Sequence, residues 1–334
     1  MTARGRLLIL GALLCIGCIP VSVAGAAGPP LPSSVSGEAG AVAPGGRDRL
    51  ITRGAGDDTL VLAVRRGDRK VLRSRLIRGR WRIAPATLAG ATTGLSADGG
   101  TLAVVRPTRQ FPAADTQLAL LAADELVVRR EISLPGFFTL DAISPDGRWV
   151  YLIQYGGANV FDYRVRALDT TTGRLAPRDI VDPREPDEQM GGLPFTRTTS
   201  RDGRWVYTLY GGGEETFIHA LDTVGQTAAC IDLEMLRPDG NLNLIQLRVS
   251  RDGRRMTVRD SGSLVATVNT RTFAVREPGE KSAGDPSSQL AARTAAAVPA
   301  DDDGFPWLIV TLVGGLGALA VLAVERRRRV TPRE

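Results

Sequence analysis

The chain is apolar at both ends and alternates between apolar and polar positions in the middle. Its first apolar run, residues 7–23, follows Arg4 and Arg6 and leads into small residues that include Ala-Gly-Ala at 24–26. A basic start, an apolar core and a small-residue cleavage pattern are the three parts of a secretory signal. We therefore predict a signal peptide at residues 1–26.

The second apolar run, residues 305–324, holds no charged residue and is followed by four arginines at 326–329. Its length corresponds to a helix of about 30 Å, which matches the thickness of a bilayer core. Because arginines collect on the cytoplasmic side, we predict one membrane span with a basic cytoplasmic tail at 325–334. Segments rich in proline, glycine, serine and alanine predict a disordered linker at 27–49 and a flexible stalk at 278–304.

A turn motif recurs four times in the middle of the chain, at intervals of 48, 56 and 50 residues. Its copies are SADGGTLAVV from Ser96, SPDGRWVYLIQY from Ser144, SRDGRWVYTLY from Ser200 and SRDGRRMTV from Ser250. Asp-Gly favours a tight hairpin turn, and the β-branched and aromatic residues that follow it favour a strand. The predicted turn residues are Asp98, Gly99, Asp146, Gly147, Asp202, Gly203, Asp252 and Gly253.

A second repeated element lies between these turns and reads as strand, turn and strand. It occurs as RVRALDTTTGRL from Arg164, as FIHALDTVGQTA from Phe217 and, more weakly, as VATVNTRTFAV from Val265. Two hairpins in each period make one four-stranded propeller blade, and a period of 40 to 50 residues is typical of such blades. We therefore predict an all-β chain with a β-propeller at 50–277 that has four to five blades. An open or paired arrangement is the alternative to a closed ring.

The Ser-x-Asp-Gly-Arg turn before an apolar strand resembles the repeats of WD40-like and TolB-type β-propellers. The resemblance covers about residues 50–277 and implies the fold, whereas such propellers serve as scaffolds, sensors, periplasmic accessory proteins and enzymes. The longer stretches YGGANVFDYRVRALDTTTGRL and YGGGEETFIHALDTVGQTAACIDL are also similar to a group of actinobacterial membrane-anchored propellers.

Most of the net positive charge of the chain lies in the predicted signal peptide and cytoplasmic tail. The full chain has a net charge of +6. The predicted signal and tail contribute seven arginines against two glutamates, so the rest holds 35 basic and 34 acidic residues. A nearly neutral ectodomain argues against a nucleic-acid partner.

Cysteine and histidine supply little chemistry. Cys15 and Cys18 lie in the predicted signal, so ordinary cleavage leaves Cys230 alone, and lipid attachment at Cys18 is the alternative. His219 is the only histidine and lies on a predicted strand, where we expect it to be packed and hydrogen-bonded. We predict no catalytic residue, no metal site and no cofactor.

Acidic residues gather at three places, listed here as Asp182, Glu185, Asp187 and Glu188; Glu214 and Glu215; and Asp301 to Asp303. The first group could bind a hard cation such as Ca²⁺, although a solvated loop is favoured because the EF-hand spacing is absent. Glu214 and Glu215 follow three glycines between two strands and are our candidate contact surface. The aspartates before the span are expected to keep that end hydrated.

Aromatic residues occupy equivalent places in two successive blades. Trp149, Tyr151, Trp205 and Tyr207 are expected to pack between blades. Tyr155 and Tyr210, which end their strands before Gly-Gly, are also expected to pack between blades, with a pocket that takes a sugar or a peptide as the alternative.

These patterns predict a single-pass membrane protein that presents a binding or scaffolding module outside the cell. Its partners would be the membrane and an extracellular protein or glycan. One alternative is an exported hydrolase or lyase with its site on one face of the ring. Another is a surface sensor, for which the ten-residue tail offers no output domain.

Overall fold

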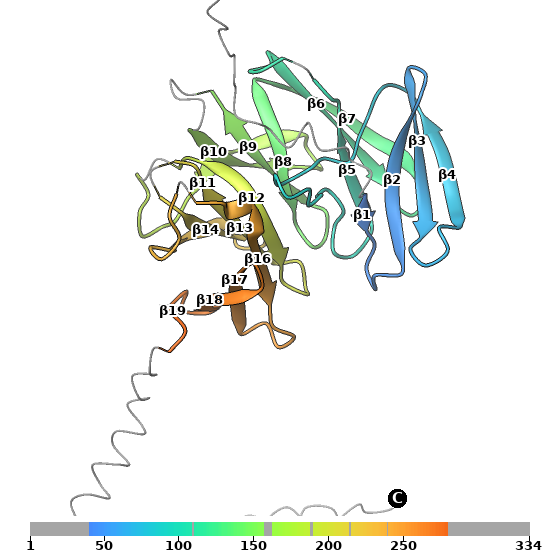
Figure 1. The fold of residues 1–334 in the computed structure, drawn as a ribbon. Helices are drawn as coiled ribbons and strands as arrows, with labels where there is room; N and C mark the ends of the chain where they lie inside the picture. Colours follow the sequence, from blue (N-terminus) through green and yellow to red (C-terminus); the bar gives the residue numbers. More distant parts are fainter. Residues whose placement is uncertain are drawn as a thin grey trace, which may run out of the picture. The chain divides into compact units, whose positions relative to one another are not determined.

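The computed structural model describes residues 40–279, except 109, 157–161, 188–189, 214 and 239. The predicted signal peptide, membrane span and tail lie outside these residues, as does the predicted stalk after residue 279. Within the described part, no helix is long and apolar enough to cross a membrane. The described chain forms five antiparallel sheets in sequence order (Figure 1). We refer to them as the first to fifth blades.

Each blade is a meander, because neighbouring strands along the chain are neighbours in the sheet. The first blade contains β1 (Ala41–Val42), β2 (Asp48–Ala55), β3 (Asp58–Arg65) and β4 (Val71–Ile77). The second contains β5 (Thr101–Val105), β6 (Asp115–Ala122) and β7 (Val127–Pro135). The third contains β8 (Phe137–Ile143), β9 (Trp149–Tyr155), β10 (Tyr163–Asp169) and β11 (Arg174–Ile180).

The fourth blade contains β12 (Leu193–Thr199), β13 (Trp205–Gly211), β14 (Phe217–Asp222) and β15 (Thr227–Asp232). A short 3-10 helix, η3 (Leu242–Leu244), leads to the fifth blade. That blade contains β16 (Ile245–Val249), β17 (Arg255–Asp260), β18 (Ser263–Asn269) and β19 (Val275–Arg276). The all-β prediction is confirmed: four of the sheets have four strands and the second has three, which is consistent with the propeller pattern of one sheet in each period.

The repeated turn is held by its own serine and aspartate. In the third blade, the Ser144 hydroxyl donates to Asp146 Oδ1 at 2.6 Å, and the same carboxylate accepts the Arg148 N–H at 3.0 Å. The serine oxygen also accepts the N–H of Trp149, the first residue of β9, at 2.9 Å. Gly147 completes the turn at a φ of 72°. The serine, aspartate and glycine of the motif therefore stabilise the turn itself.

The same bonds recur in the turns that start at Ser96, Ser200 and Ser250. The hydrogen bond from the serine hydroxyl lowers the pKa of Asp146, Asp202 and Asp252, so these carboxylates stay ionised.

The first blade contains a fifth copy of this turn that lacks the serine and the aspartate. The Ala43 N–H donates to the Asp48 carbonyl at 3.0 Å, and the Gly46 N–H donates to the Ala43 carbonyl at 2.9 Å. Both bonds have equivalents at the same spacing in the other four turns. Two glycines with positive φ, Gly45 and Gly46, replace the side-chain bonds. The first blade thus starts at Ala41, before the predicted boundary at residue 50.

Four hydrophobic cores connect the five blades. One core joins the first and second blades, one the second and third, one the third and fourth, and one the fourth and fifth. A closed ring of five blades would need a fifth core between the last blade and the first, and the described residues form none. Figure 1 shows the blue first blade and the orange fifth blade at opposite ends of the series. The blades therefore form an open series.

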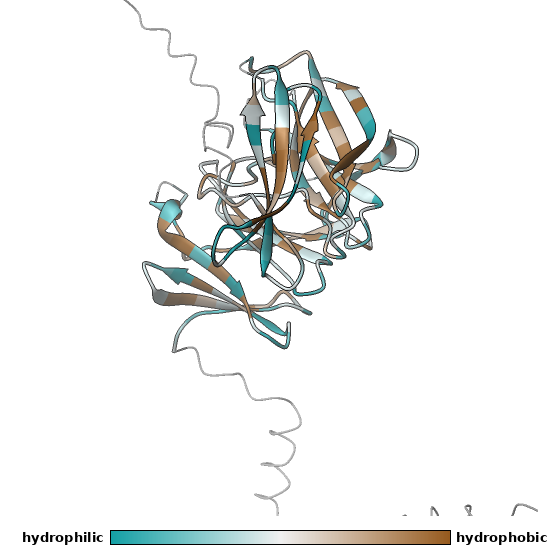
Figure 2. Ribbon diagram, turned by 90° about the vertical axis from the view of Figure 1, so that its right-hand side faces the viewer, coloured by the Kyte–Doolittle hydropathy of each residue, from teal (hydrophilic) through white to brown (hydrophobic). Residues whose placement is uncertain are grey.

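The inner strands are buried on both faces. Hydrophobic segments lie along the strands, and hydrophilic ones gather at the turns and outer ends (Figure 2). In β9, for example, Val150, Tyr151 and Leu152 are fully buried because the strand lies between two neighbouring blades.

A loop between the first and second blades crosses to the fourth blade. It forms a small hairpin in which the Ala86 N–H donates to the Ala91 carbonyl at 2.7 Å. At its tip, the N–H groups of Leu88 and Ala89 donate to the carbonyls of Pro194 and Phe195 in β12, at 2.8 and 3.0 Å. We call residues 85–92 the crossing hairpin. It links blades that are two places apart in the series.

We predict that Gly203 and Gly253 differ in their tolerance of alanine, although both belong to the sequence Ser-Arg-Asp-Gly-Arg. A Cβ on Gly203 would lie 2.5 Å from Ala97 Cβ in the neighbouring turn, whereas one on Gly253 would meet nothing within 4 Å. Left-handed strain alone costs about 1–2 kcal/mol, so Gly253→Ala should lower the melting temperature by a few degrees, about 2–4 °C per kcal/mol. Gly203→Ala should lower it at least twice as much. Equal shifts in thermal unfolding followed by circular dichroism would contradict the packing of the turns.

Candidate functional site

The repeated turns of the first, second and fourth blades and the end of β8 in the third surround a cavity of about 570 Å³. Its wall comes from the start of the first blade, the chain that leads to β5, the end of β8, and β12 with its turn. The turns of the second and third blades are in direct contact: the Asp98 N–H donates to the Pro145 carbonyl at 3.0 Å. We call the side of the molecule that carries these turns the turn face.

The cavity is lined by hydroxyl and guanidinium groups and by no carboxylate. Its polar residues are Thr92, Thr93, Ser96, Arg197, Thr199, Ser200 and Arg201. Arg201 is exposed and forms no ion pair with a carboxylate of the described chain. Thr92, Ser96 and Ser200 already donate their hydroxyl hydrogens to Gly40, Asp98 and Asp202. The guanidinium of Arg201 and the hydroxyls of Thr93 and Thr199 favour an anion such as a carboxylate, sulfate or phosphate.

Arg197 enters the wall of the cavity from a buried ion pair. Its Nη2 lies 2.8 Å from Asp141 Oδ1 and 3.2 Å from the Thr208 hydroxyl, and its Nη1 donates to the Asp141 carbonyl at 2.6 Å. Both side chains are more than nine-tenths buried. Asp141 reaches this position because the pairing of β8 with β9 shifts register between Leu140 and Ala142. The pair fixes the guanidinium at the inner side of the cavity.

A second cavity of about 730 Å³ adjoins the first and shares Ser200 and Arg201 with it. Its lining adds Asp202, Trp205, Tyr207, Arg251, Asp252, Gly253, Arg254, Thr270 and Arg271. Trp205 and Tyr207 lie stacked, with ring centroids 6.2 Å apart. Burial raises the pKa of Tyr207 to about 12, so its hydroxyl stays protonated at neutral pH. Four arginines against two aspartates make this lining basic.

Tyr155 and Tyr210 lie in the core between the third and fourth blades, as the favoured interpretation of the sequence expected, and not in an open ligand pocket. Tyr155 is 4% exposed and Tyr210 is fully buried. They belong to a row of ring contacts that continues through Tyr163 and Phe217, with the Tyr163 and Tyr210 centroids 5.1 Å apart. In this structure a ligand would have to open the core to reach either tyrosine.

Several polar groups of this core have no hydrogen-bond partner among the described residues, including the hydroxyls of Tyr163 and Tyr210 and His219 Nε2. Burial raises the pKa of both tyrosines well above its ordinary value. Burial also lowers the pKa of His219, and the Asp141 carboxylate opposes that shift only in part. His219 is therefore neutral at pH 7. The structure buries the histidine as expected, but leaves Nε2 without the expected hydrogen bond.

The structure describes only some residues of the predicted acidic loops. Glu215 is exposed, whereas Glu214 lies outside the described residues, so the contact surface there stays a prediction. Asp182 is buried and binds Arg184, with Nε and Oδ1 3.0 Å apart. Burial opposes its ionisation, but the bonds from Arg184 outweigh burial and lower the pKa of Asp182. In the described part of the chain, no three of His, Cys, Asp and Glu are grouped to hold a metal ion.

We predict that His219 makes the free energy of unfolding depend on pH below about 6.5. Since the pKa of His219 is lower in the folded protein than its ordinary 6.5, the unfolded chain binds the extra proton. The contribution of neutral His219 to the free energy of unfolding is fully present above about pH 6.5. Below that pH it is lost, by at most about 1.4 kcal/mol per pH unit for one proton. Urea unfolding should show this slope in the wild type and lose it in His219→Gln. The same slope in both proteins would contradict a buried neutral histidine.

Comparison with solved structures finds propellers. The match with the β-propeller domain of Cps50 (Swd1) from Myceliophteria thermophila has 12% identity and a TM-score of 0.40, and covers 74% of this chain and 67% of that one. The match with TolB from Acinetobacter baumannii has 12% identity and a TM-score of 0.38, and covers 72% of this chain and 54% of that one. The match with hydrazine synthase from Kuenenia stuttgartiensis has 14% identity and a TM-score of 0.39, and covers 69% of this chain and 75% of that one.

Such low identities and TM-scores give no information about what this chain binds. No family model matches the sequence. No curated protein matches it either. The solved structures that resemble the chain thus include WD40-type and TolB-type propellers, the two groups that its turn motif resembles.

Proposed function

We propose that this protein is a binding module that takes an acidic ligand on its turn face. The observation that carries the proposal is the cavity of about 570 Å³ whose lining has two arginines, five hydroxyl residues and no carboxylate. An anion there would be bound by Arg201 and by the hydroxyls of Thr93 and Thr199, because the other three hydroxyls already donate within the protein. Charge-assisted hydrogen bonds of this kind are roughly twice as strong as neutral ones.

The second cavity extends the site toward an aromatic surface. Trp205 lines it, is partly exposed and lies against the guanidinium of Arg204 at 5.7 Å. An aromatic ring beside several arginines suits a sugar that carries an acidic group, because the ring can cover the apolar face of the sugar while arginine binds the acid. We therefore propose an acidic glycan as the ligand class.

We also propose that the module is exported and held at the cell surface by one membrane span. The apolar runs at 7–23 and 305–324, with arginines beside both, support this proposal. A protein partner could bind near the exposed Glu215, and affinity capture with wild type and Glu215→Lys would test this. A partner captured equally by both would place its contact elsewhere.

We predict that Arg201→Glu abolishes binding of acidic sugars. In thermal-shift assays on the purified full-length protein, glucuronate oligosaccharides should raise the melting temperature of the wild type, and neutral glucose oligosaccharides of the same length should not. Arg178→Glu on β11 is the matched control, because that arginine is also exposed but lies outside both cavities. Equal stabilisation of wild type and Arg201→Glu would place the ligand elsewhere, and no stabilisation of the wild type would refute the ligand class.

The topology has its own test. Protease added to intact cells should remove the propeller and leave a small membrane-bound fragment, because the blades are predicted to lie outside the membrane. Immunoblotting with a tag at the C-terminus would detect that fragment. Full protection of the propeller in intact cells, with cleavage after lysis, would contradict the proposed orientation.

A further inference from the structure

The outermost strand of the first blade is unusually exposed. In β4, six successive residues are exposed and only the last, Ile77, is buried. Three of its apolar side chains, Val71, Leu72 and Leu76, are 51%, 36% and 58% exposed. These are three of the seven large apolar side chains that are exposed in the described chain. The strand pairs with β3 on one side, and its other edge pairs with no described strand.

The outer strands of the other blades are protected against further pairing. The edge of β15 is covered, because Ala228 N–H donates to the Val181 carbonyl and Cys230 N–H donates to Asp182 Oδ2, at 3.1 and 3.0 Å. Strand β11 contains a proline in its interior and β7 ends in one, and neither proline can donate to an added strand; β19 has two residues. The rest of β7 carries the exposed charges of Arg129, Arg130 and Glu131, which also disfavour pairing. Strand β4 has seven residues and no proline, and it exposes three apolar side chains beside Arg73 and Arg75, so its open edge suits a partner that complements both.

The charge of the first blade indicates what kind of partner this is. Residues 40–82 hold twelve basic and four acidic residues, whereas residues 83–279 hold 21 basic and 24 acidic residues. Lys70 and Arg75 form no ion pair with a carboxylate of the described chain. A second copy of β4 would bring like charges together, so the charge favours an acidic partner.

The pleat of β4 adds a sequence requirement. Arg73 and Arg75 pair with Ala63 and Val61, so they lie on one face of the sheet, while Leu72 and Leu76 lie on the other. A strand added at this edge would place its own side chains alternately beside arginines and beside leucines. It should therefore alternate acidic and apolar residues.

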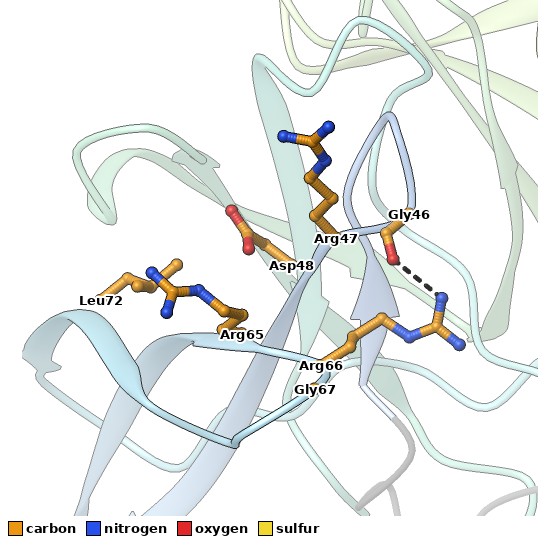
Figure 3. Close-up of a pocket in the computed structure, with 7 residues that line it drawn as sticks. All are labelled: Gly46, Arg47, Asp48, Arg65, Arg66, Gly67 and Leu72. Atoms are coloured by element: carbon orange, nitrogen blue, oxygen red, sulfur yellow. Dashed lines mark hydrogen bonds between the residues drawn. The ribbon is translucent and has the colours of Figure 1, made fainter.

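A cavity of about 520 Å³ lies at the start of β4. Figure 3 shows three of its arginines, Arg47, Arg65 and Arg66, with Asp48 between the first two and Leu72 beside Arg65. Arg66 donates to the Gly46 carbonyl at 2.9 Å, and Arg65 pairs with Asp68 at the exposed hairpin tip. This lining offers positive charge to an acidic side chain at the end of an added strand.

We propose that β4 is a docking edge for an extended acidic peptide, which adds to the first blade as a fifth strand. The backbone of the peptide pairs with the free edge of β4. Its carboxylates face Arg75 and also Arg73, whose guanidinium donates to the Asp124 carbonyl of the second blade, and its apolar residues face Leu72 and Leu76. This is strand addition of the kind that extended peptides use on exposed sheet edges.

The test measures fluorescence anisotropy of labelled peptides with the purified full-length protein. The probe is a seven-residue peptide that alternates glutamate and valine. Its controls are a peptide of the same composition with four glutamates followed by three valines, a lysine-valine alternating peptide, and the alternating acidic peptide with N-methyl groups on one edge. We expect the alternating acidic peptide to bind at least about tenfold more tightly than each control, because only it combines charge, alternation and a free backbone edge.

Variants separate this edge from the rest of the surface. Arg75→Glu should weaken binding about tenfold or more, since it replaces attraction by repulsion at an exposed position. The matched variant Arg178→Glu on the outer strand of the third blade should leave binding unchanged. Equal binding of the N-methylated peptide would refute strand addition. Binding to phosphatidylglycerol vesicles that depends on Arg75, with no binding of any peptide, would overturn the proposal in favour of a lipid surface.

Discussion

The open series of blades depends on the crossing hairpin. Four cores hold neighbouring blades together, but each core acts between one pair alone. In a closed ring the last core limits how far the blades can splay, and the described residues provide no such core. The hydrogen bonds from Leu88 and Ala89 to β12 supply a constraint between blades two places apart. The same hydrogen bonds hold two parts of the turn-face cavity together, because its wall combines the chain after this hairpin with β12.

The charge of the end blades fits the absence of closure. The first blade carries twelve basic and four acidic residues, and the fifth, residues 241–279, carries seven and three. Arg248 and Arg259 alternate with the core residues of β16 and β17, so they lie on the face of the fifth blade that no further blade covers. Joining this face to the first blade would bring two positive surfaces together and cost free energy. The open ends thus keep β4 available, and the turn face carries a separate site.

The sequence predicts the parts of the fold that depend on local chemistry. The four serine-containing turns can be found by pattern because each is stabilised by its own side chains, as Ser144 and Asp146 show. The turn from Ala43 to Gly46 escapes that pattern, since backbone bonds and glycines replace the side chains. The crossing hairpin could not be predicted, because its partners in β12 lie more than 100 residues away.

The candidate site was predicted less well for the same reason. Arg197 and Asp141 belong to different blades, and a register shift in β8 brings them together. Arg201 belongs to a repeated turn motif, so the sequence predicts only a turn at this position and does not indicate that a cavity lies beside it. For Tyr155 and Tyr210, by contrast, the sequence favours inter-blade packing over a ligand pocket, and both rings lie in the core.

Hydrogen exchange at the amides of Leu88 and Ala89 tests the central claim most directly. If the crossing hairpin holds the open series together, both amides should exchange as slowly as those of the buried strand β9, because they open only when blades separate. Exchange on the time scale of the exposed hairpin at 66–69 would contradict this claim and show that the blades are held by their four cores alone.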